Sequence, residues 1–555
     1  MPFHLCTYAV WTDTMANYGI ALDIGTSGLR CQALDLDTGE TLATAITQRH
    51  PIPGMNVIDH VNFAIQSGED VAHGLIVNAA NNLFAALGID LTQVRRIGVC
   101  GNTFQMSLFE NIEIRDLAYA GKNALKNMGV VPPERNGSIR KAEELGLVGL
   151  PNAEVIIPPA VTHEIGADAI AMLKMTNILE EKEPVIVVDY GTNAEMALVV
   201  DGKIYTGSAA AGPALEGQEI ERGMLAAPGA ISDVDPVDGG WECTVLDNSI
   251  IDVKGDIVDP TTGKILKDRK QRAIGVTGTG VVAALYCGMY GGLVNTPEIL
   301  TPDEKLHLQD GVCISKHDVE EAGKAIGALR AGFLTLLLEA GLWTGDIKKA
   351  YMSGASGLYV DAVKALGIGM VCPGATHLIQ FGNTSIEMAR KVALGKVDLM
   401  KLREFAKELR ATHVMFATNE NFKNIYSIEY SVWCTGMPAS EYNNMLEIYG
   451  LQPLSEPSKD VKVERLAKTD LPDVEKKGVI MLEESKTVLT GKVEGCIRCH
   501  KCMKACPEQA LSIELENDGV HAYVKSDRCA GTACRRCEHA CDGSFLSLKE
   551  FQIVG

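Results

Sequence analysis

The sequence predicts an α/β protein that carries a separate cysteine-rich domain at its C-terminal end. Short apolar strands alternate with helical segments from about Met15 to Tyr449. Eight of the sixteen cysteines lie within residues 479–555, and the others are scattered singly. Alternating strands and helices predict a mostly parallel or mixed sheet covered by helices. The length of 555 residues exceeds the usual domain of roughly 100–200 residues, so we expect several domains.

The prediction of an α/β fold for residues 15–449 rests on a few segments. The expected strands are short apolar runs, and two of them end in aspartate; they cover residues 18–23, 95–100, 184–189 and 349–352. Residues 324–340 place apolar side chains at helical spacing and are followed by Gly341, a helix-ending signal. The polar, proline-bearing stretch 451–478 indicates a linker.

Charge and hydropathy exclude several classes of partner. The chain has 51 basic and 71 acidic side chains, a net charge of −20, which argues against nucleic-acid or anionic membrane partners. The uncharged stretch Ala273–Pro297 contains a glycine loop and a helix of only about residues 281–290, too short for a bilayer of ~30 Å. No secretory signal precedes the first strand, so we expect a cytoplasmic protein. Residues 1–14 are expected to be an extension upstream of a true start at Met15.

Two cysteine runs near the C-terminus have the spacing of iron–sulfur ligands. The first is C-x2-C-x2-C-x3-C followed by proline, and the second has a four-residue first gap: Cys496, Cys499, Cys502, Cys506 and Pro507, then Cys529, Cys534, Cys537 and Cys541. In such runs the fourth cysteine ligates the other cluster. We therefore expect two 4Fe-4S clusters, one on Cys496, Cys499, Cys502 and Cys541, the other on Cys529, Cys534, Cys537 and Cys506. The module resembles a two-cluster ferredoxin.

Zinc binding and haem attachment are two alternative interpretations of these cysteines. Zinc also takes four thiolates, but the closely spaced third and fourth cysteines with Pro507 favour iron–sulfur clusters. The C-x-x-C-H pattern ending at His500 matches a c-type haem attachment site, yet the run continues as a ferredoxin motif.

Two D-x-G-T turns, each directly after an apolar strand, predict phosphate binding. Their glycines let backbone N–H groups approach phosphate, and their hydroxyl and amide groups contact its oxygens. The residues are Gly25, Thr26, Ser27 and Gly28 in the first turn, and Gly191, Thr192 and Asn193 in the second. Asp23 and Asp189 at the strand ends are candidates to place Mg²⁺. Two later glycine loops are expected to line the nucleotide, through Gly275, Gly278, Gly280, Gly354 and Gly357.

This order of motifs resembles the sugar kinase, heat-shock protein 70 and actin superfamily. The resemblance implies two RNase H-like (actin-like ATPase) domains with ATP in the cleft between them, followed by an α+β ferredoxin-like domain. The expected boundaries are 15–183 for the first actin-like subdomain, 184–395 for the second, 396–478 for bridging helices and linker, and 479–555 for the ferredoxin domain.

A narrower resemblance rests on further segments. Residues 101–109, 166–168, 211–217 and 329–332 look like those of the reductive activators of corrinoid proteins. The paired cluster motifs are similar to the branch that serves methylamine methyltransferases in methylotrophic methanogens. The resemblance implies ATP-dependent reduction of inactive Co(II) to Co(I), with one electron passed through Fe–S clusters. The implied partners are the corrinoid proteins of methylamine methyltransferases and a low-potential electron donor.

Some roles and functions stay open at this level. Glu216 is expected either to contact the ribose or to serve as a helix N-terminal acid. Asp168 and Glu195 are candidates for a water-activating base, with a structural role as the alternative. The alternative functions are an activator of another low-potential enzyme such as a radical dehydratase, a small-molecule kinase with an appended ferredoxin, and a redox-sensing nucleotide-binding protein.

Overall fold

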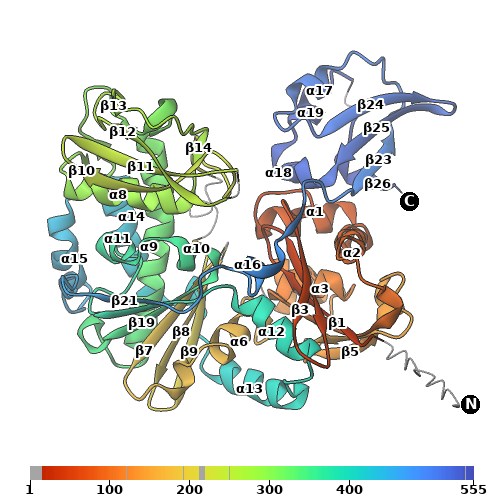
Figure 1. Ribbon diagram of the computed structural model, residues 1–555, viewed down its shortest axis with the longest axis horizontal. Coiled ribbons are helices and arrows are strands. Elements are labelled where there is room, and N and C mark those ends of the chain that lie inside the picture. The colour runs from red at the N-terminus through yellow and green to blue at the C-terminus, as the bar shows by residue number, and fades with distance from the viewer. Residues whose placement is uncertain are drawn as a thin grey trace, which may run out of the picture.

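Two α/β halves lie side by side, and a C-terminal domain stacks on the first half (Figure 1). The computed structural model describes residues 16–119, 122–191, 193–211, 219–248, 250–543 and 545–554. The expected extension 1–14 and Met15 lie outside these described residues. Among the helices that the structure describes, none is long and apolar enough to cross a membrane.

The first half is built on a seven-stranded sheet. Its order is β22-β3-β2-β1-β4-β6-β5. Strands β1, β2 and β3 are antiparallel, whereas β4 runs parallel to β1 and β6 runs parallel to β4. The strands are β1 (Tyr18–Ile24), β2 (Leu29–Asp35), β3 (Thr41–Thr47), β4 (Val94–Gly101), β5 (Ser138–Lys141), β6 (Glu154–Ile157) and β22 (Ile480–Leu482). The strands expected over 18–23 and 95–100 are confirmed as β1 and β4.

The second half repeats this arrangement. Its six-stranded sheet has the order β21-β20-β19-β7-β8-β9, with β7, β8 and β9 antiparallel and β19 and β20 parallel to β7. The strands are β7 (Val185–Tyr190), β8 (Ala194–Val200), β9 (Lys203–Ala209), β19 (Lys349–Ser353), β20 (His377–Gln380) and β21 (Lys462–Arg465). The expected strands 184–189 and 349–352 are confirmed as β7 and β19. Because β1 and β7 occupy equivalent places, the two D-x-G-T turns fall at equivalent hairpins.

Helices and a smaller sheet complete the second half. The expected helix over 324–340 is α9 (Lys316–Glu339), which starts earlier because Ser315 and Asp318 form a capping box; Gly341 follows it with φ +71°. It packs on α14 (Glu420–Cys434) in one large apolar core. A five-stranded sheet, β13-β12-β11-β10-β14, lies beyond α8 (Gly278–Tyr290). Its strands are β10 (Ala230–Val237), β11 (Gly240–Leu246), β12 (Asp252–Val258), β13 (Ile265–Lys267) and β14 (Gly275–Val276).

Helices also join the two halves. α12 (Thr384–Ala393) follows the second sheet in sequence but packs on β1 and β4 of the first. The approach is close, since a Cβ on Gly98 would lie 2.1 Å from the Ala389 carbonyl oxygen. α6 (Ala167–Lys174) contacts α12 and strands of both sheets, and α13 (Leu399–Ala411) shares this core. The remaining helices of the body are α1 (Val57–Ser67), α2 (Glu69–Ala86), α3 (Thr103–Phe109), α4 (Arg115–Ala118), α5 (Lys122–Asn127), α10 (Gly354–Tyr359), α11 (Ala362–Ile368) and α15 (Tyr442–Ile448).

Residues 451–483, which we call the strap, run from one half to the other. The sequence predicts a linker over 451–478 and a ferredoxin domain from residue 479, whereas the structure places β21 at the edge of the second sheet and β22 at the edge of the first. Between them, the Pro472 carbonyl accepts a hydrogen bond from Gln32 Nε2 at 2.7 Å, and α16 (Val474–Lys477) contacts β3. β21 contains one apolar side chain and β22 is only three residues long, so neither gives a clear strand pattern in the sequence. Short edge strands are common in natural sheets.

The C-terminal domain is a small α+β unit seated on the first half. Its sheet has the order β24-β25-β23-β26, formed by β23 (Val488–Lys492), β24 (Leu511–Glu516), β25 (Gly519–Lys525) and β26 (Gln552–Ile553). Its short helices are α17 (Lys501–Ala505), α18 (Gly531–Cys534) and α19 (Arg536–His539). α18 contacts α1, β26 contacts α2, and the domain shares one apolar core with the first half.

Candidate functional site

Five carboxylates converge from both halves and from the strap. Asp23 ends β1, Asp189 lies near the end of β7, and Glu195 faces Asp189 across the β7–β8 pair. Asp168 lies in the first turn of α6, and Asp470 comes from the strap. Electrostatic coupling joins these groups, because Asp168, Asp470 and Asp23 all raise the pKa of Asp189. The structure thus brings together Asp23, Asp168 and Asp189, the three acids expected to be catalytic.

Burial among like charges makes these carboxyls hard to ionise. Burial raises the pKa of Asp189 to about 7, and the nearby Asp168 adds to the rise. Burial likewise raises the pKa of Asp168 to about 6 and that of Glu195 well above its ordinary range. Burial also raises the pKa of Asp23, although the Arg30 guanidinium opposes that shift. Such a group of acids favours binding of a cation, which would stabilise the ionised forms.

Asp470 is a fifth acid at this place, and no sequence pattern indicates it. Arg30 lies between it and the first turn, with Nε 3.8 Å from Asp470 Oδ2 and Nη1 3.5 Å from Asp23 Oδ2. Asp470 Oδ1 is buried and meets no hydrogen-bond partner in the part of the chain that the structure describes. Nothing local marks this residue, because it belongs to a polar segment that reaches the site only through the pairing of β21 and β22.

The first phosphate turn is held by two asparagines. Gly25 N donates to Gly28 O at 3.1 Å, which closes the turn. Asn102 Nδ2 donates to Thr26 Oγ1 at 3.0 Å, so the Thr26 hydroxyl hydrogen remains available to an anion. Asn383 Nδ2 donates to Asp23 Oδ2 at 2.7 Å and fixes that carboxylate. Ser27 and Gly28 complete the turn, and Gly28 lies against Thr47.

The second phosphate turn lies beside the last glycine loop. Ser353 Oγ donates to Asp189 Oδ2 at 3.1 Å. Gly354 has φ +81°, and a Cβ there would lie 2.5 Å from Asp189 Oδ1. Both the left-handed backbone and the lack of space for a Cβ therefore require glycine at this position. Gly357 packs on Tyr190, with 3.0 Å between its added Cβ and the ring. Gly191 and Asn193 belong to the described residues, whereas Thr192 and Glu216 lie outside them.

The earlier glycine loop is placed next to this region by helix packing. α10, which begins at Gly354, contacts α8, which begins at Gly278. Gly275 and Gly280 are packed against backbone, since an added Cβ would lie 2.6 Å from Arg222 O and 2.3 Å from Ile231 O respectively. Close packing therefore accounts for these two glycines, and their expected contact with nucleotide stays a prediction.

Four cysteines from both runs line one hollow of the C-terminal domain. The four cysteines are Cys506, Cys529, Cys534 and Cys537. Pro507 and Gly531 also line this hollow. Burial raises the pKa of Cys529 to about 12, and the thiols of Cys537, Cys506 and Cys534 add to the rise. The structure thus groups the fourth cysteine of the first run with three of the second. Four thiols around one hollow fit a cubane cluster.

The remaining cysteines form the second group. Burial raises the pKa of Cys502, and the nearby Cys541 and Cys496 add to that rise. Cys499 lies in the same loop and is exposed. Backbone N–H groups point at the sulfurs, since Arg498 N donates to Cys496 Sγ at 3.4 Å and Ala510 N to Cys506 Sγ at 3.3 Å.

Left-handed backbone shapes both cysteine loops. Arg498 and His500 have φ +57°, and Arg535 has φ +46°. Alternation of right- and left-handed residues turns successive N–H groups inward, a geometry common around anionic groups such as iron–sulfur clusters. Cysteine spacing alone does not reveal these conformations.

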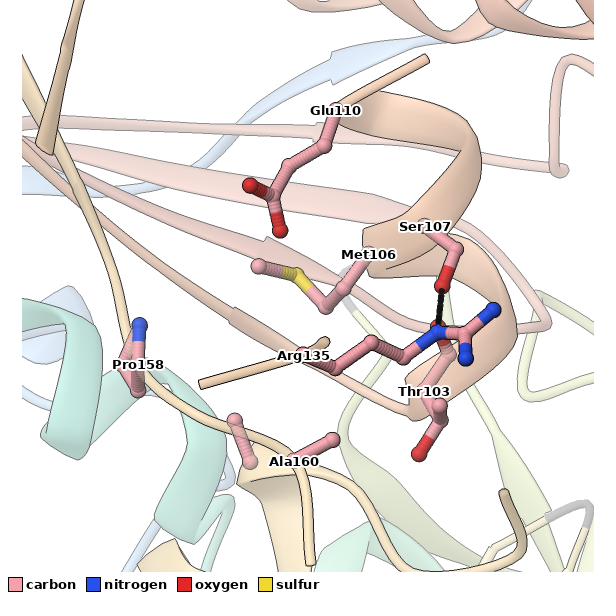
Figure 2. Close-up of a pocket in the computed structure, with 8 residues that line it drawn as sticks. Thr103, Met106, Ser107, Glu110, Arg135, Pro158 and Ala160 are labelled. Carbon is pink, nitrogen blue, oxygen red and sulfur yellow. Dashed lines mark hydrogen bonds between the residues drawn. The ribbon is translucent and has the colours of Figure 1, made fainter. Parts of the chain in front are cut away.

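A separate small pocket lies along α3 (Figure 2). Thr103, Met106, Ser107 and Glu110 line it from the helix, and Arg135 faces them. Arg135 Nε donates to Ser107 Oγ at 2.8 Å, and its Nη1 and Nη2 bind Asp116 at 2.7 and 2.9 Å. Because the guanidinium is already paired, we assign this pocket no ligand.

Comparisons with known proteins place these features in a family. Residues 18–181 match the family model described as the RACo middle region, and residues 183–443 match the model described as the C-terminal domain of RACo, the ASKHA domain. The structure is similar to a solved reductive activator for corrinoid, iron-sulfur protein, with a TM-score of 0.60 and 22% identity over 76% of this chain and 66% of that one. That likeness supports the actin-like ATPase fold expected from the sequence.

Two curated relatives extend the match. The chain is 26% identical to the corrinoid activation enzyme RamQ of Eubacterium limosum over 432 residues, which covers 74% of this chain and 69% of that protein. It is 49% identical to the Co(II) methylated amine-specific corrinoid protein reductase of Methanosarcina barkeri over 519 residues, which covers 93% of this chain and 96% of that protein. The chain therefore belongs to the family of reductive activators of corrinoid proteins.

Proposed function

We propose that the chain is an ATP-dependent iron–sulfur reductase that reduces Co(II) in the corrinoid proteins of methylamine methyltransferases to Co(I). One electron comes from a low-potential donor, and hydrolysis of ATP to ADP and phosphate drives its transfer. The main supporting observation is that α1, in the half that contains the first phosphate turn, packs against α18, which contributes to the hollow lined by four cysteines. Identity of 49% to a reductase of methylated amine-specific corrinoid proteins supports the substrate class.

Two 4Fe-4S clusters fit the eight thiols. We assign one to Cys496, Cys499, Cys502 and Cys541, and the other to Cys506, Cys529, Cys534 and Cys537. When bound, the clusters supply one-electron transfer at potentials that extend down to about −700 mV. The chain's own contribution is the inward-pointing N–H groups of Arg498 and Ala510, which stabilise negative charge on the sulfurs they contact.

Mg²⁺ with ATP fits the five carboxylates. Asp23 and Asp189 stand beside the two phosphate turns, and Oδ1 of Asp470, which meets no partner among the described residues, would supply a further oxygen ligand. Hydroxyl and backbone N–H groups of both turns would hold the phosphates. Asp168 and Glu195 stay candidates for orienting the attacking water, since both lie within electrostatic range of Asp189.

Coupling of ATP hydrolysis to electron transfer follows from chain connectivity. The nucleotide would lie between halves that the strap and α12 join, so closure of one half on the other moves both elements. The strap is followed in sequence by β23 of the C-terminal domain, which we also call the cluster domain because it contains the eight cysteines of the two runs. A conformational change of this kind transfers free energy when the corrinoid protein binds the two states differently. We place the reaction in the cytoplasm, where thiols remain reduced and able to hold iron.

The test is ATP-dependent formation of Co(I). The anaerobically purified full chain is mixed with a Co(II) methylamine corrinoid protein and a low-potential reductant, and Co(I) absorbance is followed with and without Mg·ATP. We expect Co(I) only with ATP, and none with Asp189→Asn or Cys499→Ala. The matched controls Glu464→Gln, on the exposed strap edge, and Cys313→Ala, outside both cysteine groups, should keep the reaction.

Other outcomes separate the alternatives. ATP hydrolysis with cobalt left as Co(II) across a panel of corrinoid proteins would refute the substrate assignment and favour an activator of another low-potential enzyme. Nucleotide binding that changes with cluster oxidation, without ATP turnover, would favour a redox-sensing protein.

A further inference from the structure

A series of hydrogen bonds and packing contacts, fully buried at Gln105 and His60, connects the first phosphate turn to the C-terminal domain. It begins at Asn102, the N-cap of α3, whose Nδ2 donates to Thr26 Oγ1 at 3.0 Å. The other side-chain atom, Asn102 Oδ1, accepts from Gln105 N at 2.9 Å. Any displacement of Thr26 by a bound phosphate therefore acts on the cap of α3 and on the backbone of Gln105.

Gln105 connects Asn102 to two stacked histidines, His60 and His50. Its side chain is fully buried, and its Nε2 lies 2.9 Å from His60 Nδ1. The His60 ring stacks on His50 with centroids 4.3 Å apart and planes inclined by 24°. Burial lowers the pKa of His60 to about 3, so both rings stack as neutral groups.

The histidines adjoin the segment that meets the cluster domain. His50 Nδ1 accepts from Ile52 N at 3.1 Å, and a Cβ on Gly54 would lie 3.0 Å from the His60 ring. Gly54 N in turn donates to the carbonyl oxygen of Cys529 at 2.9 Å. The line thus ends on the backbone of a cysteine that lines the four-thiol hollow.

The hydrogen-bonding capacity of this group is incompletely used. His50 Nε2, His60 Nε2 and Gln105 Oε1 are buried and make no hydrogen bond of ordinary geometry among the residues that the structure describes. Gln105 and the Gly54 backbone nevertheless lie close enough to oppose the lowering of the pKa of His50 and His60, respectively. Each buried polar atom left without such a bond costs about 1–3 kcal/mol, so a rearranged amide or ring that satisfies one of them competes with the arrangement seen. A packed element with two arrangements of similar free energy is what coupling between distant sites requires.

We propose that Gln105 and His60 are positioning residues that transmit the nucleotide state from Thr26 to the backbone of Cys529. The proposal rests on the function proposed above, since it takes ATP at one end and a 4Fe-4S cluster at the other. Its consequence is that the midpoint potential of the cluster held by Cys506, Cys529, Cys534 and Cys537 depends on the nucleotide. Neither residue touches ATP or iron, and their effect is exerted through Asn102 and Gly54.

The test measures the cluster rather than turnover. The full chain with both clusters is titrated electrochemically, followed by electron paramagnetic resonance, with Mg·ADP or a non-hydrolysable Mg·ATP analogue. We expect the reduced-to-oxidised ratio at fixed potential to differ at least threefold between nucleotides, where tenfold corresponds to about 59 mV. Gln105→Leu should remove most of that difference while nucleotide binding and iron content persist.

A matched control breaks a different contact between the same two parts of the molecule. Asn82 Nδ2 donates to Ser485 O at 2.9 Å, away from this line, so Asn82→Ala should keep the nucleotide-dependent difference. His60→Gln is the second variant if Gln105→Leu fails to fold. Hydrogen exchange of residues 51–60 should respond to the ATP analogue in the unmodified chain but not in either variant.

The outcomes are distinct. A chain that binds neither nucleotide nor iron overturns the proposed function and this inference together. A chain that binds both, but whose cluster potential and hydrogen exchange ignore the nucleotide, overturns the inference alone. The inference also fails if Gln105→Leu and His60→Gln respond to nucleotide as the unmodified chain does.

Discussion

Gly354→Ala tests the nucleotide site with a single added methyl group. The residue has φ +81°, and an alanine in this left-handed region costs about 1–2 kcal/mol. The new Cβ would lie 2.5 Å from Asp189 Oδ1, whereas ordinary van der Waals contact begins at 3.4 Å. The carboxylate must therefore move by the difference, 3.4 − 2.5 = 0.9 Å.

That movement determines the expected magnitude. It breaks the 3.1 Å bond from Ser353 Oγ to Asp189, worth about 1.5–3 kcal/mol while the carboxylate is charged. The two contributions lower the free energy of unfolding by about 2.5–5 kcal/mol at most. A catalytic group displaced by nearly 1 Å reduces turnover by roughly a hundredfold, so we expect a loss of that order in ATP hydrolysis.

Gly341→Ala is the matched control. Gly341 has φ +71° and no atom within 4 Å of an added Cβ, so the variant shares the backbone cost without the collision. The assay is phosphate release by both variants at equal iron content, together with thermal unfolding. The reasoning is refuted if Gly354→Ala hydrolyses ATP as fast as Gly341→Ala, because Asp189 would then not depend on its place beside this glycine.

Three further predictions follow from the carboxylates and the thiols. Asp470→Asn should weaken Mg²⁺ binding at least tenfold in calorimetric titrations, whereas the strap control Glu464→Gln should not. A tenfold change needs only about 1.4 kcal/mol, and unit charges about 4 Å apart attract by about 4 kcal/mol at an effective dielectric constant of 20; equal affinities would remove Asp470 from the site. Because the pKa of Asp189 is raised to about 7, Mg²⁺ must displace a proton below that pH, so its affinity should fall as pH drops from 7 to 6, and an affinity that is constant over this range would contradict the assignment. Cys529→Ala should retain roughly half of the iron by colorimetric assay and should lose Co(I) formation, whereas Cys313→Ala should retain both; full iron in Cys529→Ala would argue against its ligand role.

Much of the fold was predictable because its signals are local. The strands that carry Asp23 and Asp189 near their ends are apolar runs of five or six residues, and each is followed by a short turn that contains glycine. The cysteine runs predicted the grouping of Cys506 with Cys529, since ligand spacing within a loop reflects the size of the bound group. Helix α9 began eight residues before the expected start because its first turns carry polar side chains beside a capping box.

The site itself was predictable only in part. Asp23 and Asp189 were among the expected site residues, whereas Asp470 and Asn383 were not, because their side chains reach the site from segments far apart in the sequence. Arg30 lies opposite Asp23 in the β1–β2 pair, and its role depends on a strand register that the turn motif does not specify. The roles of Thr192 and Glu216 stay predictions.

The sequence by itself determined the two D-x-G-T turns after their strands, the thiol spacing and the alternation that makes an α/β body. These depend on backbone conformations and ligand geometries set within a few residues. Only the tertiary structure decided that residues 451–483 form a strap pairing with both sheets, and that the line of contacts through Gln105 and His60 reaches Cys529. The physical reason is that edge-strand pairing and the meeting of buried polar groups depend on packing between distant segments, which no local pattern encodes.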